Sequence, residues 1–231
     1  MLWIPGVDEK PFSVAYDDGK EFWLTICRVG AATEELFKLN VGDRVGIRGP
    51  LGTKYRWKSG ERLAVVSGGY GAAPMYFVAR KAVEDGCEIE FLTGARSEDL
   101  LLYLDRVEGM KGVNVAVSTD DGSKGHHGYV TQVLDQVLAE KKVDRVFSCG
   151  PELMMKAAGE VAASHGVPAW LSMEKYMKCG IGVCGQCSLD DSGDLVCLQG
   201  PVMSYDLVKG LPEFGEYHRD AQGQKHYFKK R

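Results

Sequence analysis

The sequence lacks several features that mark common classes of protein. Its 231 residues contain no run of about 18 apolar residues, the length that a membrane-spanning helix needs. Basic residues are not in excess, since 28 Lys and Arg stand against 32 Asp and Glu, for a net charge of −4. Binding to nucleic acid depends on a basic surface. We therefore expect neither a membrane protein nor a protein whose main partner is nucleic acid.

The N-terminus also lacks the pattern of a secretion signal. The segment MLWIPGVDEK (1–10) has neither a basic start nor a long apolar stretch. We therefore expect a cytoplasmic protein, in which clustered cysteines bind metal or do chemistry more often than they form disulfides. Cysteine is scarce, with seven in the chain, yet four of the seven lie between residues 179 and 197.

The first region, residues 1–57, has the pattern of short strands joined by turns. FWLTICRV (22–29) is rich in β-branched and aromatic residues, and DRVGIRGPLG (43–52) alternates before a Gly-Pro turn. Between them, GAATEELFKLNVGD (30–43) carries a short helical pattern. We predict an all-β unit here, an antiparallel barrel or sandwich.

Between residues 58 and 170, strands alternate with helices. The predicted strands cover 62–69, 88–96, 113–121, 144–151 and 167–174, and the predicted helices cover 73–86, 97–105, 129–141 and 151–165. Such alternation implies βαβ crossovers, so we predict an α/β domain with a doubly wound parallel sheet. Residues 171–231 form a third, small region that is rich in glycine and cysteine.

The cysteines of the third region have a distinctive spacing. Cys179, Cys184, Cys187 and Cys197 are separated by four, two and nine residues. The first two gaps are those of a plant-type [2Fe–2S] site. Gly180, Gly182 and Gly185 lie between them, and glycine allows the positive φ angles that bring backbone N–H groups close to a cluster.

A zinc site or a pair of disulfides fits these cysteines less well. Structural zinc sites usually have paired Cys-x2-Cys units, and only one such unit is present. Disulfides are rare in a reducing compartment. We therefore predict an iron–sulfur cluster and one-electron chemistry.

A glycine-rich turn and a later cysteine fall at the same predicted sheet edge. GGYGAAP (68–74) follows a strand and opens a helix, where backbone N–H groups bind a pyrophosphate. Alone, such a turn is weak support, because many are ordinary strand–helix turns. Cys149 follows the fourth strand at the edge where open α/β sheets bind ligands. The alternative for Cys149 is a buried core residue.

In this order, the motifs resemble the ferredoxin–NADP reductase-like superfamily. Within it, the chain is similar to the electron-transfer subunits of the two-subunit dihydroorotate dehydrogenases of pyrimidine synthesis. The matching stretches run essentially from end to end: PGVDEKPFS (5–13), GAATEEL (30–36), GIRGPLG (46–52), GGYGAAP (68–74), TGARSEDLL (93–101), STDDGS (118–123), CGPELMM (149–155), EKYMKCGIGVCGQC (174–187), VCLQGPV (196–202) and FGEYHRDAQG (214–223).

The resemblance implies three domains: an FAD-binding β-barrel (1–57), an NAD(P)-binding α/β domain (58–170) and a [2Fe–2S] domain with its tail (171–231). It also implies a role for residues at matching positions. Those implied to bind FAD are Lys10, Pro11, Phe12, Ser13, Ala32 and Thr33. Those implied to lie at the nicotinamide nucleotide are Gly69, Gly71, Pro74 and, as the catalytic residue beside the ring, Cys149. The implied cluster ligands are Cys179, Cys184, Cys187 and Cys197.

Two departures from the family's pattern affect the flavin site. Lys10 stands where the family has arginine, so a point charge replaces a bidentate fork. Met1 also falls inside what is, in the family, a strand leading to the flavin motif. We expect either a misassigned start codon or a barrel that is open on one side, with an exposed edge. Of the two, we favour the misassigned start.

The function implied is that of an oxidoreductase subunit. Electrons pass between NAD(P) and FAD, then through the cluster to a catalytic flavoprotein that oxidises dihydroorotate, in a heterotetramer of two chains of each kind. We expect no dihydroorotate oxidation by this chain alone. One alternative is a related reductase subunit of a sulfide dehydrogenase, a hydrogenase or a transhydrogenase. A second is a non-catalytic iron–sulfur or zinc module.

Overall fold

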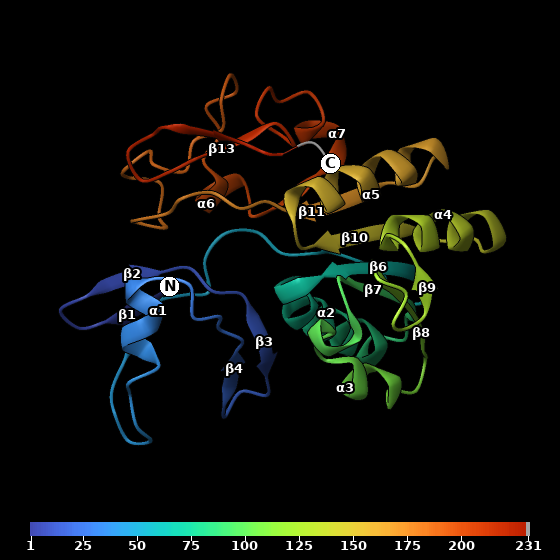
Figure 1. The fold of residues 1–231 in the computed structure, drawn as a ribbon, viewed down its shortest axis with the longest axis horizontal. Helices are drawn as coiled ribbons and strands as arrows, with labels where there is room; N and C mark the ends of the chain where they lie inside the picture. Colours follow the sequence, from blue (N-terminus) through green and yellow to red (C-terminus); the bar gives the residue numbers. More distant parts are fainter. Residues whose placement is uncertain (230–231) are drawn as a thin grey trace.

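The first part of the chain forms two small sheets beside a short helix. The computed structural model describes residues 1–229. Figure 1 shows this first part in blue at the lower left of the molecule. Its elements are β1 (Leu2–Ile4), β2 (Asp8–Lys10), β3 (Val14–Asp17), β4 (Phe22–Leu24), α1 (Ala31–Leu36) and β5 (Gly46–Ile47). The order β2-β1-β5 makes one antiparallel sheet, and β3 pairs with β4 in the other.

The strands of this part are shorter than the sequence predicts. The predicted strand over 22–29 ends at Leu24, and of the alternating stretch 43–52 only Gly46 and Ile47 pair. The helical pattern over 30–43 yields only the six residues of α1. Because the two sheets are separate in the described residues, closure into a barrel remains a prediction.

The central part is a parallel sheet with helices on both faces. Its strands are β6 (Arg62–Gly68), β7 (Glu88–Ala95), β8 (Val113–Thr119), β9 (His126–His127), β10 (Arg145–Cys149) and β11 (Ala169–Ser172). Its helices are η1 (Gly69–Gly71), α2 (Ala72–Glu84), η2 (Glu98–Leu100), α3 (Leu104–Glu108), α4 (Val130–Glu140) and α5 (Glu152–Ser164). A single helix predicted over 97–105 is wrong, since η2 and α3 replace it.

Helices cover both faces of the sheet because apolar side chains point alternately to the two faces. Along β6, Leu63 and Val65 pack towards α2 and α3, whereas Ala64 and Val66 pack towards α4 and α5. Successive side chains of a strand point to opposite faces, so a strand covered on both sides is apolar throughout. The predicted doubly wound sheet is therefore confirmed.

The third part completes this sheet instead of standing apart from it. It contains α6 (Val196–Gln199), β12 (Val202–Ser204), α7 (Tyr205–Val208), β13 (Tyr217–Arg219) and β14 (Lys225–Tyr227). Strand β12 pairs antiparallel with β11, so the full order is β12-β11-β10-β6-β7-β8-β9. The expected boundary after residue 170 falls within β11. The division into three domains stays a prediction.

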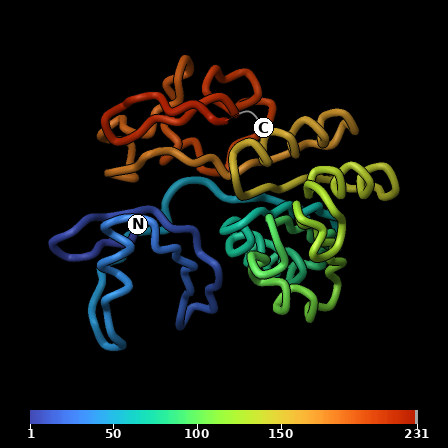
Figure 2. Tube along the Cα trace, viewed as in Figure 1, coloured from blue at the N-terminus to red at the C-terminus, as the bar shows by residue number. Residues whose placement is uncertain are grey.

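The segment between the first two parts is fastened to the third. In Figure 2 the linking segment runs below the orange part of the chain on its way to β6. Thr53 donates its backbone N–H to the Gly200 carbonyl at 2.6 Å, and its Oγ1 donates to the Val202 carbonyl at 2.8 Å. Gly52 approaches so closely that an added Cβ would lie 2.5 Å from the Gly200 oxygen. All three parts therefore meet near residues 200–202.

Packing between α5 and α7 gives the first testable prediction. A Cβ added to Gly159 on α5 would lie 2.2 Å from Cδ2 of Tyr205, which begins α7. Gly159→Ala should lower the free energy of unfolding by about 1–3 kcal/mol, because a packed ring has to move. Denaturant titration measures this change.

A second glycine provides the matched control. Gly109 has φ −79°, which any residue adopts, and an added Cβ would meet only the Asp105 oxygen at 3.8 Å. Gly109→Ala should be neutral or stabilise by about 0.4–1 kcal/mol. Equal unfolding free energies for the two variants would contradict the role given to Gly159.

Candidate functional site

One large cavity lies where the three parts meet. Its volume is about 990 Å³, and every part of the chain contributes to its wall. Six of the residues singled out from the sequence line it: Pro11, Phe12, Ser13, Pro74, Cys149 and Cys197. A cavity of this size, with apolar walls and a few polar groups, is typical of a cofactor site. The structure thus brings together residues predicted for three different cofactors.

The α/β wall of the cavity lies at the switch point of the sheet. After β6 the chain moves outward through β7 and β8, and then returns through α4 to β10 on the other side. Ligands of open α/β sheets bind at such a point, at the carboxyl ends of the strands. Here the two loops touch, because a Cβ added to Gly71 would lie 2.0 Å from the Cys149 carbonyl oxygen. Gly69 and Gly71 themselves do not line the cavity.

Cys149 is a buried and protonated thiol at this wall. Its side chain is only 8% exposed, and burial raises its pKa to about 12. The neighbouring Ser172 hydroxyl opposes that shift by hydrogen bonding, while the negative charge of Glu174 adds to it. Tyr55 also lines the cavity, and its hydroxyl donates a hydrogen bond to the Ser148 carbonyl at 2.7 Å. Cys149 is thus suited to contact a ring without attacking it.

Only part of the flavin motif predicted from the sequence lines the cavity. Pro11, Phe12 and Ser13 line the cavity, and Phe12 also packs against the small core of the first part. Lys10 is not in the wall. Its ammonium lies 2.6 Å from Asp8 Oδ2 and 5.0 Å from the centre of the Tyr176 ring. The basic position of the motif therefore contacts the segment that leads to the cysteines.

Ala32 and Thr33 are not in the cavity wall either. Both are buried in α1, where Thr33 Oγ1 accepts hydrogen bonds from the N–H groups of Val29 and Gly30 at 3.0 and 3.1 Å. The same hydroxyl donates to the Gly30 carbonyl at 3.0 Å. Thr33 therefore stabilises the start of α1. Its predicted contact with FAD remains a prediction.

The cysteine loop is arranged by its glycines. Gly180, Gly182 and Gly185 have φ of 69°, 79° and 69°, which confirms the positive angles expected from the sequence. The turns that result direct three backbone N–H groups at one sulfur. Ile181, Val183 and Cys184 donate to Cys179 Sγ at 3.5, 3.4 and 3.4 Å.

The four thiols of the loop form two pairs. The Cys184 N–H donates to Cys179 Sγ at 3.4 Å, and the Cys197 N–H donates to Cys187 Sγ at 3.4 Å. In residues 1–229 no three His, Cys, Asp or Glu side chains gather closely enough to hold a single metal ion. Two pairs of thiols suit a cluster of two irons, in which each iron takes two protein ligands. This arrangement fits a [2Fe–2S] cluster better than one zinc ion.

The two pairs differ in their electrostatic surroundings. Backbone N–H groups, that of Ile181 above all, lower the pKa of Cys179 to about 6. Burial, with the Cys187 thiol as a further cause, raises the pKa of Cys197 to about 11. Cys187 and Cys197 are buried, whereas Cys184 is exposed. Cys197 lines the cavity wall, and so does Gly180 next to Cys179, so both ends of the cysteine loop reach the cavity.

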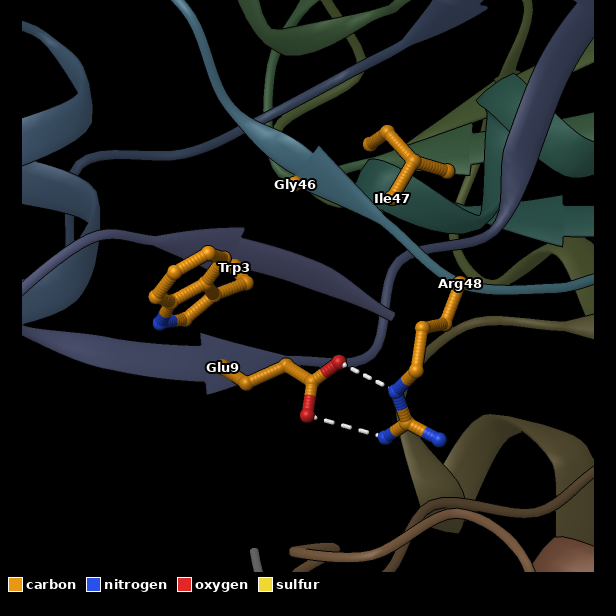
Figure 3. Close-up of a pocket in the computed structure, with 5 residues that line it drawn as sticks. All are labelled: Trp3, Glu9, Gly46, Ile47 and Arg48. Carbon is orange, nitrogen blue, oxygen red and sulfur yellow. Dashed lines mark hydrogen bonds and ion pairs between the residues drawn. The ribbon is translucent and has the colours of Figure 1, made fainter.

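Arg48 joins the first part to the cysteine loop. In Figure 3 the Arg48 guanidinium donates two hydrogen bonds to the Glu9 carboxylate, each at 2.8 Å. Trp3 and Ile47 are drawn in the same view. The same Nη2 donates to the Cys179 carbonyl at 2.8 Å. Trp3, Glu9, Gly46, Ile47 and Arg48 line a smaller surface pocket of about 350 Å³, and Ile47 and Arg48 also line the large cavity.

Sequence reasoning missed several polar residues of the site. Ser172, Glu174 and Lys175 line the cavity between Cys149 and the cysteine loop. The last two belong to the motif EKYMKCGIG, which indicates a family but assigns these two side chains no role. Their place at the end of β11 was the available signal, because that strand ends at the ligand-binding edge.

Comparison with known proteins agrees with this geometry. Residues 174–209 match the family model of the iron–sulfur cluster binding domain of dihydroorotate dehydrogenase B, and residues 65–160 match the oxidoreductase NAD-binding domain. The chain is 45% identical to a Methanocaldococcus jannaschii protein named "probable dihydroorotate dehydrogenase B (NAD(+)), electron transfer subunit", over 99% of this chain and 86% of that protein. The Methanothermobacter thermautotrophicus protein of the same name is 42% identical, over 94% and 81%.

A solved structure is similar as well. The NADH-dependent reduced ferredoxin–NADP oxidoreductase aligns with a TM-score of 0.78 at 32% identity, over 88% of this chain and 75% of that one. Separately, no helix within residues 1–229 has the length and apolar character needed to cross a membrane.

The protonated state of Cys149 gives a second prediction. With a pKa of about 12, roughly one thiol in ten thousand is ionised at pH 8. Cys149 should therefore resist maleimide in the folded protein and react once the protein is unfolded, whereas half-exposed Cys27, which is not a proposed cluster ligand, should react before it. Peptide mass spectrometry measures both. Early modification of Cys149 would refute the assigned state.

The contact between the two loops gives a third prediction. Gly71→Ala should weaken nicotinamide nucleotide binding more than about tenfold, since the new methyl group forces the loop away from β10. Gly69→Ala, with φ 52° and open space around its Cβ, should cost about 1–2 kcal/mol of stability and leave that contact in place. Calorimetric titration measures binding, and equal losses in the two variants would count against a special role for Gly71.

Proposed function

The chain belongs to the family of dihydroorotate dehydrogenase B electron-transfer subunits, and from this membership we propose that it carries electrons between a catalytic dihydroorotate dehydrogenase subunit and NAD(P). The carriers are FAD and a [2Fe–2S] cluster. The names of its relatives specify NAD(+), so NAD is the proposed nucleotide. The observation that carries the proposal is that one cavity is lined by Pro11, Phe12 and Ser13 of the flavin motif, by Pro74 and Cys149 beside the switch point, and by the proposed cluster ligand Cys197.

Residues in different parts of the cavity wall hold different cofactors. Pro11, Phe12 and Ser13 hold the flavin against the first part, and Pro74 with Cys149 holds the nicotinamide on the opposite wall. When bound, these cofactors supply hydride and single-electron transfer, so the chain itself needs no nucleophile. The protein's contribution is to orient the two rings, exclude water from between them and fix their distance from the cysteine loop.

The proposed cluster ligands are Cys179, Cys184, Cys187 and Cys197. The three N–H groups directed at Cys179 Sγ stabilise a charged sulfur and favour ligation there. Because Cys197 lines the cavity, its pair is proposed to lie towards the flavin. The exposed Cys184 then lies on the side from which a partner protein accepts electrons.

A catalytic partner subunit follows from the proposed function. The partner is a flavoprotein that oxidises dihydroorotate, and the proposed assembly is a heterotetramer with two chains of each kind. A second candidate is a reductase subunit that serves another electron acceptor. The likeness to the ferredoxin–NADP oxidoreductase favours this candidate, since it spans most of both chains.

The test combines cofactor content with turnover, and is our fourth prediction. Protein prepared without oxygen should hold FAD and about two irons per chain. Cys184→Ala should lose the cluster signal in electron paramagnetic resonance and most electron transfer, while Cys87→Ala, whose thiol donates to the Lys58 carbonyl at 3.3 Å far from the loop, should retain both.

Partner identity is decided separately. Co-purified with the dihydroorotate-oxidising flavoprotein, the chain should support reduction of NAD⁺ by dihydroorotate. A chain that holds both cofactors and oxidises NADH, yet gives no turnover with that partner, would favour the second candidate. A colourless chain that holds one zinc ion would refute both.

A further inference from the structure

We propose that the buried ion pair between Lys175 and Glu213 tunes the redox equilibrium of the flavin in the large cavity. In this arrangement Lys175 favours the reduced flavin, and Glu213 positions it. The inference deepens the proposed function and rests on it. It assigns a role to two residues that the motif comparison leaves without one.

The pair is enclosed to an unusual degree. Lys175 Nζ lies 2.8 Å from Glu213 Oε1, with side chains 7% and 2% exposed. No other ion pair among residues 1–229 has both partners as deeply buried. Glu213 Oε1 also accepts the Asp190 N–H at 3.2 Å, whereas its Oε2 is buried with no hydrogen-bond partner in the described residues.

Stability alone does not account for such a pair. Removing two charges from water costs more than their attraction commonly returns, and apolar residues of similar size are often equally stable or more so. The surrounding core is apolar, with Leu189 and Phe214 nearby in the same cluster of buried residues. An apolar pair would fit this core, so the charges point to an electrostatic role.

The orientation of the pair supports that role. Lys175 is part of the cavity wall and Glu213 is not, so the positive partner stands on the cavity side with the negative partner behind it. A fixed dipole thus faces the space proposed for the flavin. Lys175 also immediately follows Glu174, another residue of the wall.

Several other titratable groups lie near the pair. Burial raises the pKa of Glu174 and of Glu152, so both carboxyl groups shift towards the neutral form. Glu152 accepts the Gly215 N–H at 2.7 Å, next to Glu213 in the chain. Asp190 is already paired with Arg219 at 2.8 Å. Arg48, Lys54 and Lys81 also line the cavity, and among these cations Lys175 is the one paired with a buried carboxylate.

Reduction adds electrons, and therefore negative charge, to the bound flavin. A positive charge held close by lowers the free energy of the reduced form and raises its potential. Electrons then leave one at a time: the flavin is oxidised as the cluster is reduced, and Lys175 exchanges no proton or bond. Lys175 is thus a tuning residue, and Glu213 sets its place.

The fifth prediction uses variants of opposite sign in the holoprotein. Lys175→Met should lower the flavin potential, with at least a tenfold change in the equilibrium constant of two-electron reduction, or about 30 mV. Glu213→Gln should raise it, because the ammonium loses its counter-charge. Lys175→Arg keeps the charge and should stay near the wild-type value. Spectroelectrochemical titration measures all three.

An exposed lysine serves as the control. Lys209 pairs with Asp206 on α7 with side chains 51% and 82% exposed, so Lys209→Met should leave the potential unchanged. Shifts of the same sign in Lys175→Met and Glu213→Gln would indicate a loosened fold and overturn the inference. If Lys175→Met does not fold, the inference is overturned when Glu213→Gln does not raise the flavin potential.

The outcomes also separate this inference from the function on which it rests. A wild-type chain that binds no flavin overturns both. A chain that binds flavin and oxidises NADH, but whose potential is the same in all variants, overturns only the role of the ion pair.

Discussion

The close approach of Gly52 to Gly200 is the contact on which the shared cavity depends. Thr53 reaches the Gly200 carbonyl at 2.6 Å because Gly52 has no side chain, and a Cβ there would lie 2.5 Å from the Gly200 oxygen. The segment that carries Gly52 connects the small sheets to the α/β part, and Gly200 lies two residues before the edge strand β12. One backbone contact therefore sets how the flavin motif, the switch point and the cysteine loop face one another.

The pKa of each cysteine at the site depends on the groups that surround its thiol. Cys179 has three N–H groups directed at its sulfur and a lowered pKa, while Cys149 is enclosed by apolar walls and has a raised one. The same type of side chain is thus suited to bind metal in one place and to remain an inert contact in the other. Glycines in the loop account for the first state, and strand burial for the second.

Local patterns in the sequence were enough to predict the parts that depend on neighbours in the chain. The alternation over 58–170, the positive φ of the loop glycines and the spacing of the cysteines are of this kind. Features formed by distant segments could not be predicted. Strand β12 completes a sheet begun 140 residues earlier, from Arg62 to Val202, and Glu213 reaches back to Lys175. No periodicity marks such contacts, because they depend on how finished elements pack.

The location of the charges shows why a shared cavity suits electron transfer. Each part alone offers an incomplete wall, and a cofactor there would be open to water, where charges are screened. Once the walls meet, the proposed flavin site lies in low-dielectric surroundings, so a small change of charge at the wall should have a large effect on the redox equilibrium. Lys175 belongs to this shared wall, from which we propose that its charge acts on the flavin. In this proposal two different features of the fold do two different things. The apolar walls bind the cofactors, and a buried ion pair adjusts the redox potential of the flavin.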